Sequence, residues 1–559
     1  MTVRVPIALL AGGLLLPVLI STGCSRPLEA DMILLNGKIV TLDPGNAVVE
    51  AVAICGERVE RTGSNQEIRS LAGKNTLVVD LDGRTVLPGF NDAHLHFEAG
   101  GFSLLQVRLY GVTTPEEIQR RVKTMVDSLP EGSWVRGRGW DHTLLPGSRW
   151  PTKELLDEAA PDNPVYLRRV CGHVGWANSA ALKAAGITRH TPDPEGGEIV
   201  RYRDGNPTGI LKEDAGSLIA DAIPERTAEE RRRAIETALR EVARLGITSV
   251  QEMGTSPEAL DIYQELYDRG NLTVRISASL NVEEGDDHLP PVRDLSQYDS
   301  HRLRIGSAKV YADGALGAAT AALLEPYHDH PDSRGIVVTP KARIRRLVCR
   351  ANQEHRQMAV HAIGDRANRM VLDAYAEASH EYPFPGHRHR IEHDQVLAPE
   401  DIPRFAEMGI IVSMQPIHCT SDMRWAEDRL GPERIKGAYA WRSVLDTGAH
   451  LAFGSDWPND KLDPILGIHA AVTRQNADGL PEGGWYPEQC ISLEEALRAY
   501  TLGSAYASFE EDIKGSIEEG NLADLVVLSK PIFEIQPRKL LETKVLMTIM
   551  GGKIVYEQD

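Results

Sequence analysis

Residues 87–97 read LPGFNDAHLHF, a segment that begins with the apolar residues LPGF and has two histidines, separated by a single residue, near its end. The apolar start is typical of a buried strand, and His94 and His96 come where that strand would end. Because side chains alternate along a strand, both imidazoles of an H-x-H pair face the same side. We therefore predict a strand over Thr85–Asn91 whose carboxyl end presents two metal ligands.

Seven further strand-like runs follow before position 455. They are Ile247–Met253, Thr273–Leu280, Arg304–Tyr311, Gln357–Ala362, Arg388–His393, Ile410–Gln415 and His450–Gly454. Helical patterns separate most of them, as in AEERRRAIETALREVARLG at 228–246. Strands that alternate with helices predict an α/β fold, and a count of eight favours a (β/α)8 TIM barrel. A doubly wound open sheet is the alternative.

Residues that bind metals stand at the ends of five of these strands. They are His94, His96, Lys309, His361, His393 and Asp456. The carboxyl ends of barrel strands form the active-site face, so these residues would meet there. Imidazole nitrogens and a carboxylate suit Zn²⁺ and similar ions, so four histidines and one aspartate could bind two divalent ions, with Zn²⁺ expected.

Lys309 requires a modification before it can take part in such a site. A protonated amine has no lone pair, whereas an amine that has reacted with CO₂ becomes a carbamate with two oxygens that could bridge two ions. Taken singly, each histidine is explained as a hydrogen-bonded core residue and Lys309 as a salt-bridged one. The metal site is predicted from their joint position at strand ends.

Roughly 150 residues separate the first two predicted strands, far more than an ordinary connection between a strand and a helix. We predict an insertion over about 101–222 that acts as a lid or a substrate-binding subdomain. His173, Trp176 and Asn178 in CGHVGWANSAAL, and Asp313 after Lys309, are candidate substrate-binding residues. In the alternative interpretation Asn178 caps a helix and Trp176 packs in the core.

The two ends of the chain share a β pattern. Alternating apolar and polar residues occur in 30–84 and again in 513–559, where neither stretch is large enough to fold alone. We predict one small composite β-sandwich from both stretches, with the barrel over 85–512 between them.

Residues 1–23 have a single positive charge, Arg4, an apolar run and small residues before Cys24, which predicts an export signal. Small residues before a cysteine indicate a lipoprotein signal with Cys24 as the lipidation site, although Ser21 stands where such signals usually have leucine. We expect a membrane-anchored protein of the bacterial cell envelope that faces the periplasm. A secreted protein and an uncleaved anchor are the alternatives.

Composition limits the partners. The chain has 61 Lys plus Arg against 80 Asp plus Glu, a formal charge of −19, which argues against nucleic-acid binding. The cysteines beyond Cys24 are scattered and odd in number, so a disulfide framework is not expected.

Several longer motifs identify a family. They are LPGFNDAHLHF (87–97), AKVYADGALGAATAALLEPY (308–327), HAIGDRANRMVLDAY (361–375), RHRIEHDQVL (388–397), SMQPIH (413–418), GSDWP (454–458) and GSIEEGNLADLVVL (515–528). With them the chain resembles the amidohydrolase superfamily, specifically its family 3, the YtcJ-like group related to N-substituted formamide deformylase.

The resemblance implies a site with one or two ions. His94, His96 and Asp456 would hold one ion, His361 and His393 the other, and a carboxylated Lys309 would bridge them. It also implies the composite β-sandwich beside the barrel.

These residues predict a metal-dependent amidohydrolase that splits a C–N bond of a small amide with metal-activated water. Asp456 would accept the proton of the attacking water and pass it to the leaving nitrogen. A deaminase or an ester or lactone hydrolase is the alternative within the enzymes, and a solute-binding lipoprotein the alternative outside them. A homodimer is a further expectation.

Overall fold

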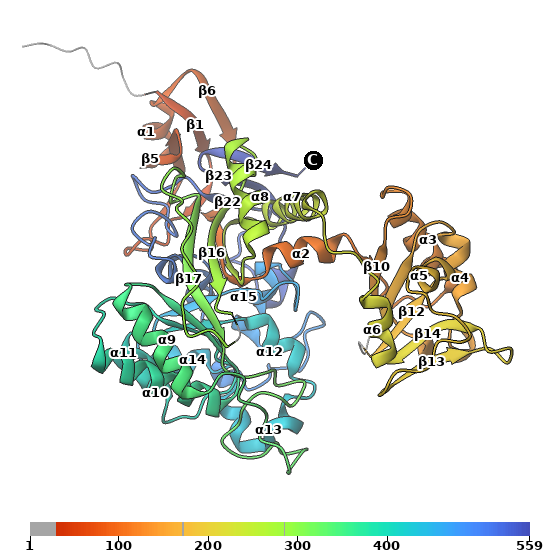
Figure 1. Ribbon diagram of the computed structural model, residues 1–559. Helices are drawn as coiled ribbons and strands as arrows, with labels where there is room; N and C mark the ends of the chain where they lie inside the picture. Colours follow the sequence, from red (N-terminus) through yellow and green to blue (C-terminus); the bar gives the residue numbers. More distant parts are fainter. Residues whose placement is uncertain (1–28, 170–172, 284, 559) are drawn as a thin grey trace, which may run out of the picture.

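The computed structural model describes residues 29–169, 173–283 and 285–558 (Figure 1). The predicted signal segment, Cys24 and Cys171 lie outside the described residues. No helix in the described ranges is long and apolar enough to cross a membrane.

The centre of the molecule is a sheet of eight parallel strands. In order they are β8 (Phe90–Leu95), β15 (Ile247–Met253), β16 (Arg275–Asn281), β17 (Leu303–Tyr311), β18 (Met358–Ala362), β19 (Arg390–His393), β20 (Ile411–Met414) and β21 (Leu451–Phe453). Two backbone hydrogen bonds join its edges: Asp456 N donates to His94 O (2.7 Å), and His96 N donates to Trp457 O (2.8 Å). The sheet is thus a nearly closed barrel. The predicted TIM-barrel fold is confirmed, and the open-sheet alternative is wrong.

Helices surround the barrel. They are α2 (Phe97–Leu104), α7 (Ala228–Arg244), α8 (Pro257–Asp268), α9 (Lys341–Gln353), α10 (Asp365–Glu381), α11 (Ile402–Met408), α12 (Pro416–Asp422), α13 (Ala426–Arg434), α14 (Trp441–Asp446), α15 (Pro464–Thr473), α16 (Leu493–Arg498) and α17 (Ser504–Ala507). Helix α7 is longer than α2, the other helix of this layer that precedes β15. It begins with a capping box between Thr227 and Glu230. Its buried face carries Ile235, Leu239 and Val242, which belong to the barrel core.

Two further sheets pack together beside the barrel. One has the order β5 (Arg58–Gly63), β4 (Ala51–Cys55), β1 (Ala30–Leu35) and β6 (Ala72–Asp80), with α1 (Asn65–Arg69) beside it. The other has the order β24 (Lys553–Glu557), β23 (Val545–Met550), β22 (Leu525–Leu528), β7 (Thr85–Pro88), β2 (Lys38–Val40) and β3 (Val48–Val49). One hydrophobic cluster contains Met32 and Val52 from the first sheet and Val86, Leu525 and Ile549 from the second. The two ends of the chain therefore share one core.

The predicted first barrel strand, Thr85–Asn91, is wrong in its boundaries. Thr85–Pro88 forms β7, which pairs with β22 and β2, and the barrel strand begins at Phe90. The chain passes from one sheet to the other at Gly89, where an added Cβ would lie 2.3 Å from the Thr248 side chain. The barrel therefore starts at Phe90 and not, as predicted, at residue 85.

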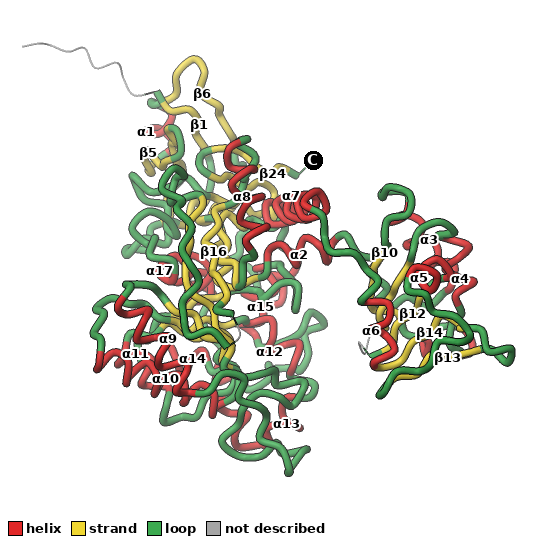
Figure 2. Tube along the Cα trace, in the orientation of Figure 1, coloured by secondary structure: helices red, strands yellow, loops and turns green. Residues whose placement is uncertain are grey.

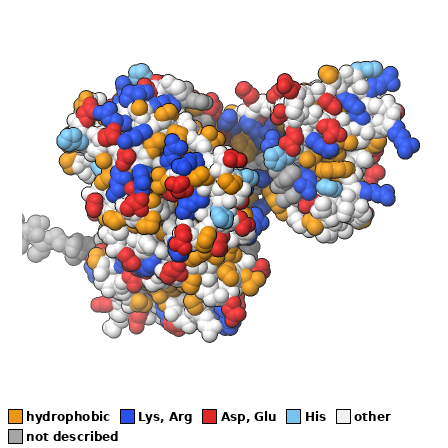
Figure 3. Space-filling model, turned by 90° about the horizontal axis from the view of Figure 1, so that it is seen from below, with side chains coloured by type: hydrophobic (Ala, Val, Ile, Leu, Met, Phe, Trp, Pro, Cys, Tyr) orange, Lys and Arg blue, Asp and Glu red, His pale blue; other side chains and the backbone are white. Residues whose placement is uncertain are grey.

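The long insertion forms a body of its own beside the barrel (Figures 1 and 3). Its mixed sheet has the order β13 (Gly197–Arg201), β14 (Pro207–Glu213), β12 (Val174–Ala177), β11 (Val165–Arg169), β10 (Val135–Trp140) and β9 (Val107–Arg108). Its helices are α3 (Pro115–Val126), α4 (Lys153–Ala159), α5 (Ser179–Ala184) and α6 (Ser217–Ala220). Figure 2 shows it joined to the rest through the segments after α2 and before α7. We call residues 107–220 the insertion.

The insertion begins later than predicted. Residues 101–104 belong to α2, which packs against α7 so closely that a Cβ on Gly101 would lie 2.1 Å from Ala234 O. Helix α2 is therefore part of the helical layer around the barrel.

A buried ion pair joins the barrel to the sandwich. Arg275 of β16 donates from Nε to Asp524 Oδ2 (2.6 Å) and from Nη2 to Asp524 Oδ1 (2.9 Å). Asp524 also accepts from Gly551 N (2.8 Å), and both side chains are buried.

We expect Arg275→Met to destabilise the protein by about 3–5 kcal/mol, because it leaves the Asp524 carboxylate buried without its cation. Thermal unfolding followed by circular dichroism measures the loss. The control is Arg120→Met, which breaks an exposed pair with Glu117 and should leave the melting temperature almost unchanged. Equal melting temperatures for the two variants would show that the buried pair does not stabilise this junction.

Candidate metal centre

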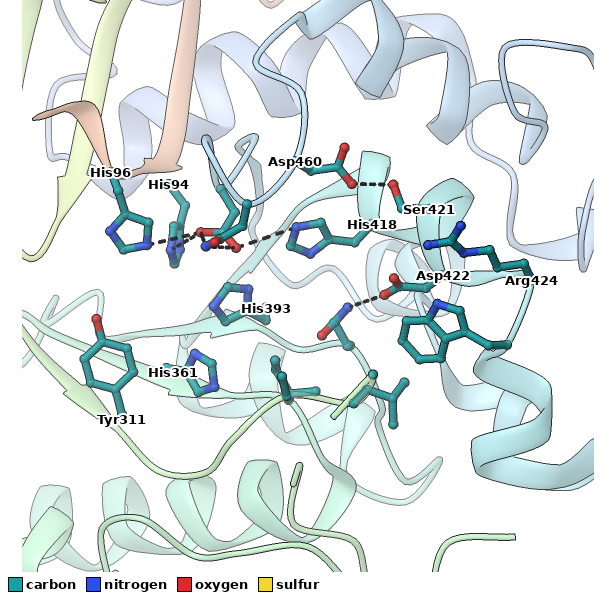
Figure 4. A pocket seen from close by; sticks show the side chains of 18 of the residues that line it. His94, His96, Tyr311, His361, His393, His418, Ser421, Asp422, Arg424 and Asp460 are labelled. Atoms are coloured by element: carbon teal, nitrogen blue, oxygen red, sulfur yellow. Dashed lines mark hydrogen bonds and ion pairs between the residues drawn. The ribbon is translucent and has the colours of Figure 1, made fainter. Parts of the chain in front are cut away.

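The predicted ligand residues meet in one cavity at the carboxyl ends of the barrel strands (Figure 4). Its volume is about 640 Å³. The six residues predicted at strand ends all line it: His94, His96, Lys309, His361, His393 and Asp456. Segments that are hundreds of residues apart in the sequence thus present their polar side chains to the same space.

The Asp456 carboxylate lies beside the imidazoles of His94 and His96. Its Oδ1 atom lies 3.2 Å from His96 Nε2 and 3.5 Å from His94 Nε2. Asp92 holds the backbone on both sides, because its Oδ1 accepts from His94 N (3.0 Å) and from Ser455 N (3.1 Å). These three predicted ligands therefore form a compact group whose ligand atoms all lie within 4.8 Å of one another.

Three histidines of the cavity each have one ring nitrogen bonded to the protein. The contacts are His94 Nδ1 with Glu392 Oε2 (2.6 Å), His393 Nδ1 with Gln415 Oε1 (2.8 Å) and His361 Nε2 with Gly314 O (3.1 Å). In each case the second nitrogen remains for a ligand, and His94 Nε2 is buried with no hydrogen-bond partner among the described residues. This pattern is typical of metal-binding histidines, since the outer acceptor sets the tautomer and the ring orientation.

The charge of Glu392 is balanced by Arg390. Arg390 forms an ion pair with Glu392 inside the barrel, and both side chains are buried. From the sequence, both residues, which flank His393, are expected to form structural ion pairs, and this pair is one. The structure shows that Glu392 links this ion pair to His94.

Lys309 is fully enclosed in the same cavity. Its Nζ atom is buried and has no hydrogen-bond partner in the described part of the chain. Burial lowers the pKa of Lys309 to about 8, because the low-dielectric surroundings disfavour the charged amine. A buried amine without a partner is costly, so this position fits a lysine that carries a further group.

The electrostatics favour neutral imidazoles beside an ionised carboxylate. Burial, followed by the nearby Lys309, lowers the pKa of His94 to about 4 and that of His361 to about 3. Burial alone would raise the pKa of Asp456, but the hydrogen bond from His96 and the imidazoles around it hold that pKa well below the usual range. These are the protonation states in which histidine and aspartate bind metals.

His418 is a site residue that the sequence analysis missed. It lies on α12, with Nε2 3.6 Å from Asp456 Oδ2, and its ring lines the same cavity as His96 (Figure 4). His393, His418 and Asp456 form a second group with metal-ligand geometry. The motif SMQPIH contains His418, but this residue comes four positions after β20 ends at Met414 and is therefore not a strand-end residue.

The predicted substrate-binding residues of the insertion do not line the cavity. Trp176 is fully buried and donates to Thr152 O (3.2 Å). Asn178 is buried at the start of α5, where its side chain accepts from Ala181 N. Both side chains are therefore packed inside the insertion, as the alternative of a packed tryptophan and a helix cap predicts. His173 is exposed and contacts Glu213 (3.0 Å).

Asp313 is buried beside the site, and its carboxylate accepts from the backbone N–H groups of Ala322, Ile363 and Gly364. It lies 3.5 Å from His361 Nε2 but does not line the cavity. Asp313 therefore holds the loops around His361 in place.

Fold and site together define the class of barrel hydrolases with a histidine and carboxylate centre at the barrel mouth. The chain belongs to the amidohydrolase family, whose model matches residues 77–556. The putative amidohydrolase YtcJ of Bacillus subtilis (strain 168) is 35% identical over 94% of this chain and 99% of its own length.

Two other similar proteins span almost the whole chain. The N-substituted formamide deformylase of Arthrobacter pascens is 31% identical over 94% of this chain and 98% of its own length. The crystal structure of an uncharacterized metal-dependent hydrolase from Pyrococcus furiosus has a TM-score of 0.73 and 33% identity, and covers 91% of this chain and 100% of that one. The predicted family and the prediction of a C–N hydrolase are confirmed, and the last similarity supports a divalent metal in the site.

We expect Gln415→Met to weaken metal binding by about 10–100-fold, because it removes the acceptor that orients His393. Equilibrium dialysis against Zn²⁺ measures the affinity. The matched control is Gln475→Met, whose side chain contacts Pro481 O outside the cavity and should leave the affinity unchanged. If both variants bind Zn²⁺ like the unmodified protein, Gln415 does not position His393.

Proposed function

We propose that this protein hydrolyses the C–N bond of a small non-peptide amide, with Zn²⁺ as the expected ion and one or two ions bound. The observation that carries the proposal is the meeting of His94, His96 and Asp456 with Lys309 in one cavity. The similarity to an N-substituted formamide deformylase makes N-formyl amines the first substrates to test.

The residues present fit the metal. His94, His96 and Asp456 would hold one ion; His361 and His393 would hold the other, with a carbamate on Lys309 between them. The unpartnered His94 Nε2 and Lys309 Nζ atoms support this assignment, since buried polar atoms normally have partners. A divalent ion would supply Lewis acidity that activates water and polarises the substrate carbonyl.

The carbamate would form at the buried amine. The lone pair of neutral Lys309 Nζ would attack the carbon of CO₂, so that a C–N bond forms while one C=O π bond opens and leaves its electron pair on oxygen. The proton lost from the nitrogen would pass to solvent. The product is an anion with two oxygens. Such a group matches the cationic ions and removes the cost of burying an unpaired ammonium.

Asp456 would move the proton. Its two oxygens face His96 on one side and His418 on the other, and Asn459 Nδ2 donates to both at 3.1 Å. These contacts hold the carboxylate at the centre of the cavity, where it accepts a proton from the attacking water and delivers it to the leaving nitrogen.

The lipid anchor at Cys24, the periplasm-facing location and the homodimer are likewise proposals, and they stand on the sequence alone. Labelling of growing cells with a radioactive fatty acid tests the first two, since only the lipidated chain would carry the label into the membrane fraction.

We expect Asp456→Asn to lower the turnover of an N-formyl amine by at least about 10²–10⁴-fold, because the amide cannot accept the proton. Formate and amine release are measured together, and the metal content of the variant is measured alongside. The matched control is Asp446→Asn, which alters an exposed carboxylate paired with Arg442. Near-normal turnover of Asp456→Asn would contradict the role. Release of ammonia or an alcohol from other substrates would instead favour a deaminase or an ester hydrolase.

We expect native mass spectrometry of the metal-loaded protein to show the added mass of one CO₂, which Lys309→Arg should lack. The guanidinium remains protonated and does not form a carbamate. The Arg variant should also bind less metal than the unmodified protein. A fully metal-loaded protein without the added mass would show that Lys309 is unmodified.

A further inference from the structure

Three arginines lie side by side across the sheet of the insertion. In the strand register Arg138 of β10 is opposite Arg108 of β9 on one side and opposite Arg168 of β11 on the other. Partners in register project from the same face of a sheet. We call Arg108, Arg138 and Arg168 the arginine row.

The arginine row has no acidic partner. None of its members forms a salt bridge with any residue in the described ranges, although the molecule as a whole has more acidic than basic side chains. The opposite face of the same strands carries Val107, Val135 and Leu167, which are buried in the core of the insertion. The row therefore occupies the open face of the sheet.

Like charges directly opposite each other destabilise a sheet, so such a row calls for a counterion. Two more arginines increase the local charge: Arg136 and Arg226 lie on the same side. Arg136 Nε is buried without a hydrogen-bond partner in the described structure, and burial, together with the charge of Arg226, lowers the pKa of Arg136 to about 10. The site is thus positively charged, and one of its buried N–H donors has no acceptor among the described residues.

Two members of the row face the cleft between the insertion and the barrel. This cleft, of about 1010 Å³, is lined by Arg108 and Arg138 from the insertion and by the loop that follows Asp456. Figure 3 shows Lys and Arg side chains at the junction between the two bodies. A neighbouring cavity continues from Arg138 to Arg168.

The cleft borders the candidate metal centre. Arg424, Asn459 and Asp460 line both the cleft and the cavity of the metal ligands. Figure 4 shows Arg424 at the edge of that cavity. The acidic residues of the cleft are engaged elsewhere: Glu241 pairs with Arg244, Asp460 accepts from Ser421, and Asp463 caps α15.

We propose that the arginine row binds the anionic end of an elongated substrate whose scissile C–N bond lies among the metal ligands. The expected chemical class is an N-acyl compound with a carboxylate at its far end, because arginine binds carboxylates through paired, charge-assisted hydrogen bonds. This inference rests on the proposed hydrolase function for the position of the scissile bond, but not for the binding of the anion.

The test compares two substrates of equal chain length, an N-formyl ω-amino acid and an N-formyl alkylamine. We expect the metal-loaded protein to prefer the anionic substrate in kcat/KM by roughly tenfold or more, the effect of one charge-assisted contact. The double variant Arg108→Gln/Arg138→Gln should lose that preference and keep its activity on the neutral amide. Both side chains are exposed, so the variant should fold.

The matched control is Arg203→Gln, an exposed residue between β13 and β14 that lines neither cavity. It should retain the full preference for the anionic substrate. If the double variant also retains the preference, or if the unmodified protein has none, the proposal is overturned.

A second measurement keeps this proposal separate from the proposed function. Isothermal titration with the dicarboxylate adipate should show binding to the metal-loaded protein that is weakened roughly tenfold or more in the double variant. If neither amide is hydrolysed but adipate binding depends on the two arginines, the function fails and the anion site stands. Equal adipate binding by both proteins, or none, would overturn the anion site itself.

Discussion

One backbone hydrogen bond, from Asp456 N to His94 O, contributes both to the closure of the barrel and to the geometry of the site. It joins the first barrel strand to the segment after the last, and it places the central carboxylate beside the first imidazole. Asp456 and His393 both have positive φ angles, 56° and 82°. Positive φ angles cost free energy at non-glycine residues, so the surrounding packing must hold these two side chains in place.

The other parts of the fold support this junction. The ion pair between Arg275 and Asp524 links the barrel to the sandwich, which is built from both ends of the chain. Glu392 and Gln415 then orient His94 and His393 from within the barrel. The insertion lies outside this framework. It has its own core and presents its arginine row to the cleft beside the metal cavity.

The barrel and most of the site could be predicted from the sequence, because the carboxyl ends of barrel strands lie together regardless of the length and sequence of the loops between them. The alternation of strands and helices predicted the barrel, and all six strand-end residues meet in one cavity. The break between β7 and β8 was missed because the apolar run from Val86 to Phe90 continues across it. His418 was missed because it follows its strand on a helix. The arginine row was invisible because Arg108, Arg138 and Arg168 come together only through strand pairing, which no local pattern reveals.

The central claim is that these residues form a metal centre. The most direct measurement is a crystal structure of the purified protein with anomalous diffraction at the zinc absorption edge. The account predicts an anomalous peak between His94, His96 and Asp456, and continuous density from Lys309 Nζ toward the same point. A structure from crystals grown with excess Zn²⁺ that shows no peak in this cavity would contradict it.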